Sequence, residues 1–201
     1  EVEQAIAAGD QIAAEQIADG AQLLISGDLG IGNTTIAAAL IAASLRVPAA
    51  AVTGRGTGID EGTLVHKTAL IEAALARAGE RIADPTDRLV ALGAADFAAA
   101  VGFMTGAARR GVPVLLDGVI AVAEALVAED LAPGTKAWLQ AGHRSTEPGQ
   151  ALARAQVRLR IGLQRQGAVK HRLAQPHGAE HILQRLARTH MHVHVAGGHQ
   201  R

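Results

Sequence analysis

Cysteine is absent from the 201-residue chain, and aromatic residues are nearly so: Trp138, Phe97, Phe103 and no tyrosine. Without cysteine there is no disulfide scaffold, thiol nucleophile or cysteine-bound metal or iron–sulfur centre. This composition is compatible with a reducing compartment. Binding of single-stranded nucleic acid by base stacking is disfavoured, because such surfaces need several exposed aromatic rings.

Long apolar runs are absent too. The apolar stretches 112–116 and 119–123 are interrupted by Asp117 and Glu124, so none reaches the roughly 18 residues that a membrane-spanning helix requires. The chain starts at Glu1 without a basic, then apolar, export segment. We therefore predict no membrane partner. Because the chain opens directly into a helical pattern without an initiator methionine, we interpret it as a fragment or a processed chain.

Acidic residues are almost missing from the C-terminal quarter. Residues 1–147 hold 10 Lys and Arg against 18 Asp and Glu, a balance of −8, whereas residues 148–201 hold 9 Lys and Arg and only Glu180, a balance of +8. Such asymmetry indicates a separate segment, an interaction tail or a foreign sequence. We predict an α/β domain over 1–150 and a basic tail of uncertain structure over 151–201, rich in His, Arg and Gln. One hypothesis is that the tail is non-native, translated from a shifted reading frame.

The tail contains seven of the nine histidines. In a strand, His190, His192 and His194 would share a face, and His199 follows, a pattern that suits zinc or nickel. It lacks a carboxylate, so adventitious nickel affinity is the favoured interpretation and no physiological metal is predicted. The basic tail could contact phosphates, but it has no aromatic platform or recognised fold, so we predict no nucleic-acid partner.

Residues 1–150 alternate between short apolar runs, glycine turns and alanine-rich helical segments. The pattern predicts strands at 22–26, 112–116 and 137–141, and helices at 1–20, 36–45, 61–78, 96–110 and 119–129, with Pro85 in the first turn of another. Asp96 is predicted to cap its helix. Buried strands alternating with helices are typical of an α/β fold with a mainly parallel sheet.

A glycine-rich turn at 27–35 (GDLGIGNTT) follows the first predicted strand and opens the next helix. Its backbone N–H groups, the hydroxyls of Thr34 and Thr35 and the helix N-terminus suit a phosphate. The spacing approaches a Walker A motif, but Asn33 replaces the lysine. This argues against a nucleoside triphosphatase and leaves a monophosphate ligand open. Taken alone, the loop could equally be a tight turn.

A second glycine loop, 54–58 (GRGTG), offers Arg55 and Thr57 to an anion, or is a flexible turn with a solvated arginine. Lys67 on the following helix, taken alone, is predicted to face solvent. Asp117, at a predicted strand end, could bond a ribose hydroxyl or cap the next helix, and we favour the cap.

Five motifs in order carry a family resemblance: 27–35, 54–58, His66-Lys67, 112–118 (VPVLLDG) and 142–149 (GHRSTEPG). Over residues 1–150 the chain resembles the nicotinate-nucleotide–dimethylbenzimidazole phosphoribosyltransferase family. The resemblance implies a Rossmann-like three-layer fold, a cytoplasmic homodimer, and no metal or organic cofactor. It implies transfer of phosphoribosyl from nicotinate mononucleotide to 5,6-dimethylbenzimidazole, giving α-ribazole 5′-phosphate and nicotinate, in cobalamin assembly.

The resemblance also implies the residues that bind the mononucleotide. They lie on the two glycine loops, the following helix and the turn after the second strand: Asp28, Gly30, Gly32, Asn33, Thr34, Gly54, Arg55, Gly56, Thr57, Gly58, Lys67, Asp117 and Gly118.

The chain departs from the family pattern in three ways. Asp28 and Leu29 stand where the family carries Glu and Met, and the family's N-terminal part, which helps to form the benzimidazole pocket, is absent. The catalytic Glu of the family's Leu-Arg-Leu-Gly-Glu-Gly segment has no counterpart in the nearest echo, 159–164 (LRIGLQ). Glu180 is the only downstream acid. We therefore assign no catalytic residue and expect impaired turnover, with a non-catalytic module binding a nucleotide monophosphate as the alternative.

Overall fold

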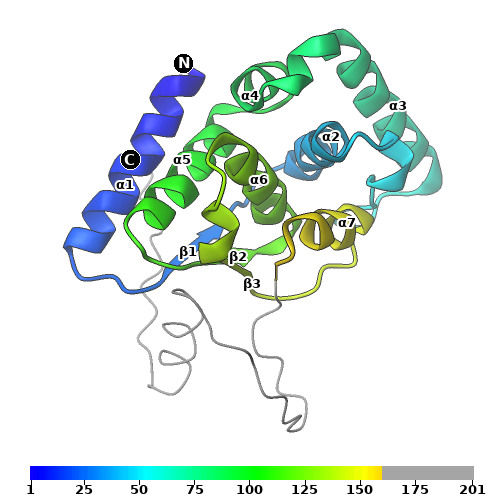
Figure 1. The fold of residues 1–201 in the computed structure, drawn as a ribbon. Coiled ribbons are helices and arrows are strands. Elements are labelled where there is room, and N and C mark those ends of the chain that lie inside the picture. The colour runs from blue at the N-terminus through cyan, green and yellow to red at the C-terminus, as the bar shows by residue number, and fades with distance from the viewer. Residues whose placement is uncertain (160–201) are drawn as a thin grey trace, which may run out of the picture.

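The computed structural model describes residues 1–159, which form a helix-rich α/β unit around a small sheet (Figure 1). The sheet contains β1 (Leu24–Gly27), β2 (Val114–Asp117) and β3 (Leu139–Ala141), in that order. Both pairings are parallel: Leu24 is opposite Val114, and Val114 is opposite Leu139. The predicted α/β class with a parallel sheet is confirmed.

Seven α-helices and three short 3-10 helices surround the sheet within residues 1–159. They are α1 (Val2–Ala18), α2 (Asn33–Leu45), η1 (Ala49–Ala51), α3 (Glu61–Ala78), η2 (Gly79–Ala83), α4 (Pro85–Leu92), α5 (Ala95–Arg109), α6 (Gly118–Leu131), η3 (Thr135–Trp138) and α7 (Pro148–Val157). The prediction for α3 is confirmed at both ends. α2 begins three residues earlier than predicted, because Gly32 takes a left-handed conformation at its N-terminus.

The core is made largely of small side chains. Most of α2 and α6 is buried, including five alanines of α2 and four of α6. These two helices contact each other, and α5 and α6 both pack on β1 and β2. Alanine-rich faces let helices approach closely, so the sheet and its glycine loops rest on a rigid base.

The closest helix crossing joins α1 and α5, which lie side by side in Figure 1. A Cβ built on Gly9 would lie 1.8 Å from the carbonyl oxygen of Ala99, and one on Gly102 would lie 1.9 Å from that of Ile6. Asp10 pairs with Arg109 at 2.8 Å at one end of this crossing. The two helix backbones therefore touch at positions that only glycine can occupy.

Two predicted caps differ from the structure. Ala94 occupies the N-cap position of α5, while Asp96 lies inside the first turn, where its carboxylate accepts the N–H of Phe97. The Asp96 cap was therefore wrong. Asp117 does occupy the N-cap position of α6 but makes no capping hydrogen bond. Its Oδ1 instead lies 3.3 Å from Nδ1 of His143, because β2 and β3 end side by side.

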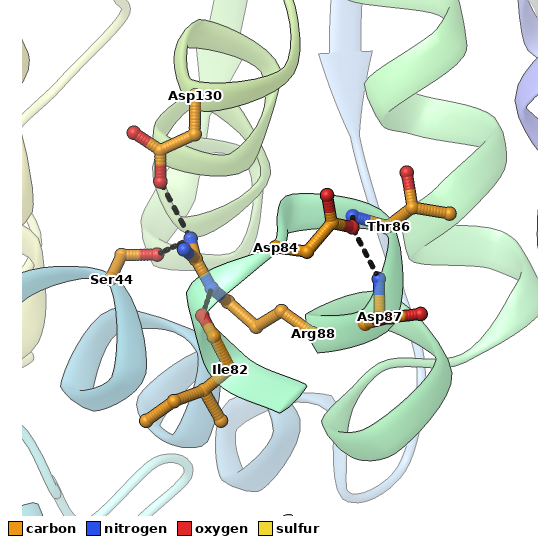
Figure 2. A network of polar contacts seen from close by, with 7 residues as sticks. All are labelled: Ser44, Ile82, Asp84, Thr86, Asp87, Arg88 and Asp130. Atoms are coloured by element: carbon orange, nitrogen blue, oxygen red, sulfur yellow. Dashed lines mark hydrogen bonds and ion pairs between the residues drawn. The ribbon is translucent and has the colours of Figure 1, made fainter. Parts of the chain in front are cut away.

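A buried arginine joins α4 to α2 and α6 (Figure 2). Arg88 is 5% exposed. Its guanidinium donates to the carbonyl of Ile82 at 2.8 Å, to Ser44 Oγ at 2.7 Å and to Asp130 Oδ2 at 2.6 Å. Every one of these partners comes from a different element, so the arginine positions the helices behind the sheet.

Replacing Arg88 by leucine is expected to lower the free energy of unfolding by about 2 kcal/mol, because it leaves the Ile82 carbonyl and the Ser44 hydroxyl without their donor. The double variant R88L/D130L should be about as stable as R88L, since Asp130 is 42% exposed and water can solvate its carboxylate. Urea denaturation followed by circular dichroism measures both. Equal stability of R88L and the parent chain would contradict the structural role.

The predicted boundary at residue 150 falls inside α7, and the division into 1–150 and 151–201 stays a prediction. The tail histidines, Glu180 and most of the 159–164 segment lie outside the described residues. Within residues 1–159, no helix has the length and apolar character needed to cross a membrane.

Candidate functional site

A cleft of about 640 Å³ opens between the two glycine loops and α3. Its walls come from three segments: Leu29, Gly30, Ile31, Gly32, Thr34 and Thr35; Arg55, Gly56, Thr57 and Ile59; and Thr63, His66, Lys67 and Leu70. Seven of the residues implied by the resemblance are among them. The loops are far apart in sequence, so the cleft exists only because α3 packs against α2.

The first glycine loop turns directly into α2. Gly32 has φ 90°, and its carbonyl accepts the N–H of Thr35 at 2.8 Å. Below the loop, Asn33 Nδ2 donates to Asp28 Oδ2 at 2.5 Å. This bond ties the two ends of the loop together. The free N–H groups at the start of α2, with their partial positive charge, border the cleft beside Thr34.

Lys67 connects the two glycine loops. Its Nζ donates to Thr34 Oγ1 on the first loop and to the Gly54 carbonyl on the second, both at 3.0 Å. The side chain is only 8% exposed, so the solvated interpretation of this residue was wrong. It is buried because its face of α3 turns toward α2. Burial lowers the pKa of Lys67, and the carboxylate of Glu147 opposes this shift.

The second glycine loop is shaped by two glycines in left-handed conformations, Gly56 at φ 55° and Gly58 at φ 112°. Arg55 donates to the Ile59 carbonyl at 2.8 Å and pairs with Glu61. The Arg55 side chain remains half exposed at the cleft. The Arg55 guanidinium is thus positioned by Ile59 and Glu61, and it is exposed enough to contact an anion in the cleft.

Glu147 is a site residue that the sequence reasoning missed. Its Oε1 accepts the N–H of Gly56 at 2.8 Å. A Cβ on Gly54 would lie 2.2 Å from its Oε2, so the carboxylate lies directly against the second loop. The signal was the 142–149 motif that contains it, to which no chemistry had been assigned. Glu147 therefore attaches the start of α7 to the second glycine loop.

Replacing Glu147 by alanine is expected to free the Gly56 N–H and loosen this loop. A hydrogen bond to a charged acceptor contributes about 1.5–3 kcal/mol, so hydrogen exchange at Gly56 should accelerate at least tenfold. Amide exchange measured by NMR tests this, with E15A on the exposed face of α1 as a matched control. Unchanged protection at Gly56 in E147A would contradict the attachment.

Asp117 and Gly118 lie apart from the cleft walls, at the carboxyl end of β2. Asp117 pairs with Gly27 in the sheet register and faces His143 beyond β3. Asp117 is 70% exposed at its side chain. The carboxyl ends of parallel strands are the usual ligand edge of α/β sheets. The role of Asp117 and Gly118 in binding the mononucleotide stays a prediction.

Asp28 is the only acid within the first loop, residues 27–35. Burial raises the pKa of its carboxyl, Asp96 raises it further, and the bond from Asn33 partly offsets both. Within residues 1–159, no cluster of three or more metal-ligating side chains occurs. The cleft thus combines a buried lysine and a helix N-terminus, which suit an anion, and Asp28 lies at the start of the first loop.

The comparisons with known proteins agree with this geometry. A family profile described as phosphoribosyltransferase matches residues 1–184. The chain belongs to the phosphoribosyltransferase family. The matched range extends past residue 150, where the resemblance in the sequence ends, and covers part of the basic tail.

Two curated relatives show the similarity in detail. Both are named nicotinate-nucleotide–dimethylbenzimidazole phosphoribosyltransferase. The relative from Mycobacterium avium is 54% identical over 153 residues, which is 76% of this chain and 44% of the relative. That from Mycobacterium leprae (strain TN) is 52% identical over 159 residues, 79% of this chain and 45% of the relative. The chain therefore spans less than half the length of these relatives.

Solved structures carry the same fold. The crystal structure of CobT from Thermus thermophilus superposes with a TM-score of 0.77 at 40% sequence identity, covering 90% of this chain and 53% of the other. A second structure from the same organism, titled as the nicotinate-nucleotide–dimethylbenzimidazole phosphoribosyltransferase, gives a TM-score of 0.74 at 37% identity. The predicted family is confirmed.

Proposed function

We propose that this phosphoribosyltransferase chain binds nicotinate mononucleotide in the cleft and takes part in transfer of its phosphoribosyl group to 5,6-dimethylbenzimidazole. The observation that carries the proposal is the buried Lys67 Nζ, which bridges Thr34 on one glycine loop and Gly54 on the other. A buried cation between two glycine loops, beside a helix N-terminus, is suited to one phosphate.

The phosphate would sit on the Lys67 side of the cleft. There it can take hydrogen bonds from the Thr34 hydroxyl, from Lys67 and from backbone N–H groups at the start of α2, with Arg55 closing from the second loop. The lysine comes from α3 and not from the Walker position, which Asn33 occupies. This arrangement favours a monophosphate over a triphosphate with Mg²⁺.

The nicotinate ring of the mononucleotide and the benzimidazole ring of the acceptor would occupy the apolar part of the cleft. Leu29 and Ile31 at the loop tip are fully exposed, and Ile59 and Leu70 line the opposite wall. In the transfer, the bond from the anomeric carbon to the pyridinium nitrogen breaks and nicotinate leaves with the electron pair. A benzimidazole nitrogen bonds to that carbon, and the proton on its other nitrogen passes to a base. Holding both rings in one part of the cleft would accelerate the transfer, because the reacting atoms are oriented toward each other.

A homodimer in the cytoplasm is part of the same proposal. It rests on the family resemblance, and Val65 on α3 and Val90 on α4, each more than half exposed, are apolar side chains available to an interface. Light scattering after gel filtration tests the dimer. The lack of cysteine, which is compatible with a reducing compartment, supports the cytoplasm.

The second candidate is a non-catalytic module that binds a nucleotide monophosphate. It is favoured by the lack of a carboxylate base among the described residues that line the cleft, none of which is Asp or Glu. This candidate predicts binding of the mononucleotide without transfer.

One experiment separates the two candidates. Nicotinate release from nicotinate mononucleotide is followed by chromatography with the purified chain, with and without dimethylbenzimidazole, and binding is measured in parallel by calorimetry. Release that depends on the acceptor base establishes the transferase. Binding without release establishes the module. Tighter binding of ATP with Mg²⁺ than of the mononucleotide would contradict both.

A further inference from the structure

His66 belongs to the wall of the cleft that α3 provides. Thr63, His66, Lys67 and Leu70 all line the cleft from this helix, because positions three and four apart lie on the same helix face. His66 is exposed, so its imidazole is open to a molecule in the cleft. It lies next to Lys67, where the phosphate is proposed to bind, and one helical turn before Leu70, in the apolar part. His66 therefore borders both the phosphate position and the place of the rings.

His66 is also the one side chain among the described cleft-lining residues that suits a base at neutral pH. Apart from His66, the titratable side chains there are Arg55 and Lys67. A guanidinium stays protonated in proteins, and the Lys67 ammonium already donates to Thr34 and Gly54. A neutral imidazole has a free lone pair and exchanges a proton near neutral pH. A proton released within these walls therefore has His66 as its chemically suited acceptor.

Two cations share the cleft with His66, namely Lys67 of the same helix and Arg55 of the second glycine loop. Arg55 is paired with Glu61. α2 and η1, which pack on α3, contain no charged residue. Further charges lie outside the cleft walls, at the N-cap of α3, on α3 itself and on η2 and α4, which also pack on it: Asp60, Glu72, Arg77, Glu80, Arg81, Asp87 and Arg88. The phosphate of a bound ligand would thus supply the negative charge that stabilises an imidazolium in the cleft.

We propose that His66 is the base that accepts the proton of the benzimidazole acceptor during the transfer. The inference rests on the proposed function and deepens it by naming a catalytic residue. One nitrogen of the acceptor bonds to the anomeric carbon, the bond from this carbon to the pyridinium nitrogen breaks, and nicotinate leaves with the electron pair. The other nitrogen of the acceptor passes its proton to the lone pair of the His66 imidazole. The imidazolium then releases this proton to water.

Two substitutions separate a base from a positive charge at this position. H66Q keeps polarity and H66R keeps a cation, but neither accepts a proton at neutral pH. Both should lower kcat for nicotinate release by about 100-fold or more, while calorimetry shows mononucleotide affinity close to that of the parent chain. R77Q is the matched control, because Arg77 is exposed on the same helix and does not line the cleft. If H66R transferred as fast as the parent chain, His66 would act only as a charge, and the proposal would be overturned.

The pH dependence of kcat gives a readout that a structural role would not change. In the parent chain, kcat should fall as the pH decreases, because a protonated imidazole cannot accept a further proton. The acidic decline should be absent in H66A, and free imidazole added to H66A should restore part of the transfer. The same acidic decline in H66A as in the parent chain, without rescue by imidazole, would contradict the assignment.

A measurement without turnover keeps this inference separate from the proposed function. Proton NMR detects nuclear Overhauser contacts between dimethylbenzimidazole and the His66 ring, whose signals are assigned by their loss in H66Q. A contact supports His66 beside the acceptor even if nicotinate mononucleotide fails to bind, a failure that would contradict only the proposed function. If the mononucleotide binds but dimethylbenzimidazole makes no contact with His66, or no nicotinate is released, the inference is overturned while the binding site stands.

Discussion

Replacing Lys67 by methionine is expected to weaken binding of nicotinate mononucleotide by about 10- to 100-fold. The lysine donates to both glycine loops, so a phosphate between them would meet its ammonium directly. A hydrogen bond to a charged group contributes about 1.5–3 kcal/mol, and each 1.4 kcal/mol is about tenfold in affinity. Calorimetry with the mononucleotide and with inorganic phosphate measures the loss for the whole ligand and for its anion.

The K67M chain should remain folded, which makes its binding defect interpretable. Burial lowers the pKa of Lys67, so the folded state bears a desolvation cost for this charge that methionine, of similar length, removes. Lys136 provides the matched control, because it is half exposed and pairs with Glu129 away from the cleft. K136M should bind as the parent does. Affinity within twofold of the parent in K67M would exclude a phosphate at this position.

Replacing Gly102 by alanine is expected to cost about 3 kcal/mol or more in the free energy of unfolding. The added Cβ would lie 1.9 Å from the carbonyl oxygen of Ile6, a distance at which backbones must move apart. Overpacking costs about 1–3 kcal/mol in cores that can adjust, and a crossing of two rigid backbones adjusts poorly. Because whole domains are stable by only about 5–15 kcal/mol, a large share of the stability is lost.

Gly62 is the matched control for this substitution. It also lies in a helix, α3, but a Cβ there would meet only Asp60 Oδ1 at 3.6 Å. G62A should therefore raise stability by about 0.4–1 kcal/mol, because alanine restricts the unfolded chain. Urea denaturation of both variants measures the contrast. If G102A and G62A behaved alike, α1 and α5 would not cross as closely as described.

Local patterns in the sequence determined much of this protein. A parallel α/β sheet was predicted from apolar runs of strand length, glycine turns and alanine-rich helical segments. The predicted ends of α3 are also the observed ones, with Asp60 as its N-cap and Gly79 as its C-cap. Each of the two glycine loops was predicted from its own residues to be either an anion cradle or a plain turn. These features follow from backbone preferences that act over a few residues, which a single sequence displays directly.

Only the tertiary structure decided which side chains meet. Lys67 is a solvent-facing lysine by its helical context, yet packing of α3 on α2 buries it between two loops. Glu147 accepts a hydrogen bond from Gly56, which lies 91 positions away in the sequence. Glu124 is buried because neighbouring elements cover α6, and its carboxyl has no hydrogen-bond partner among the described residues. Such contacts depend on non-local packing, in which desolvation and charge act between residues that the sequence keeps far apart.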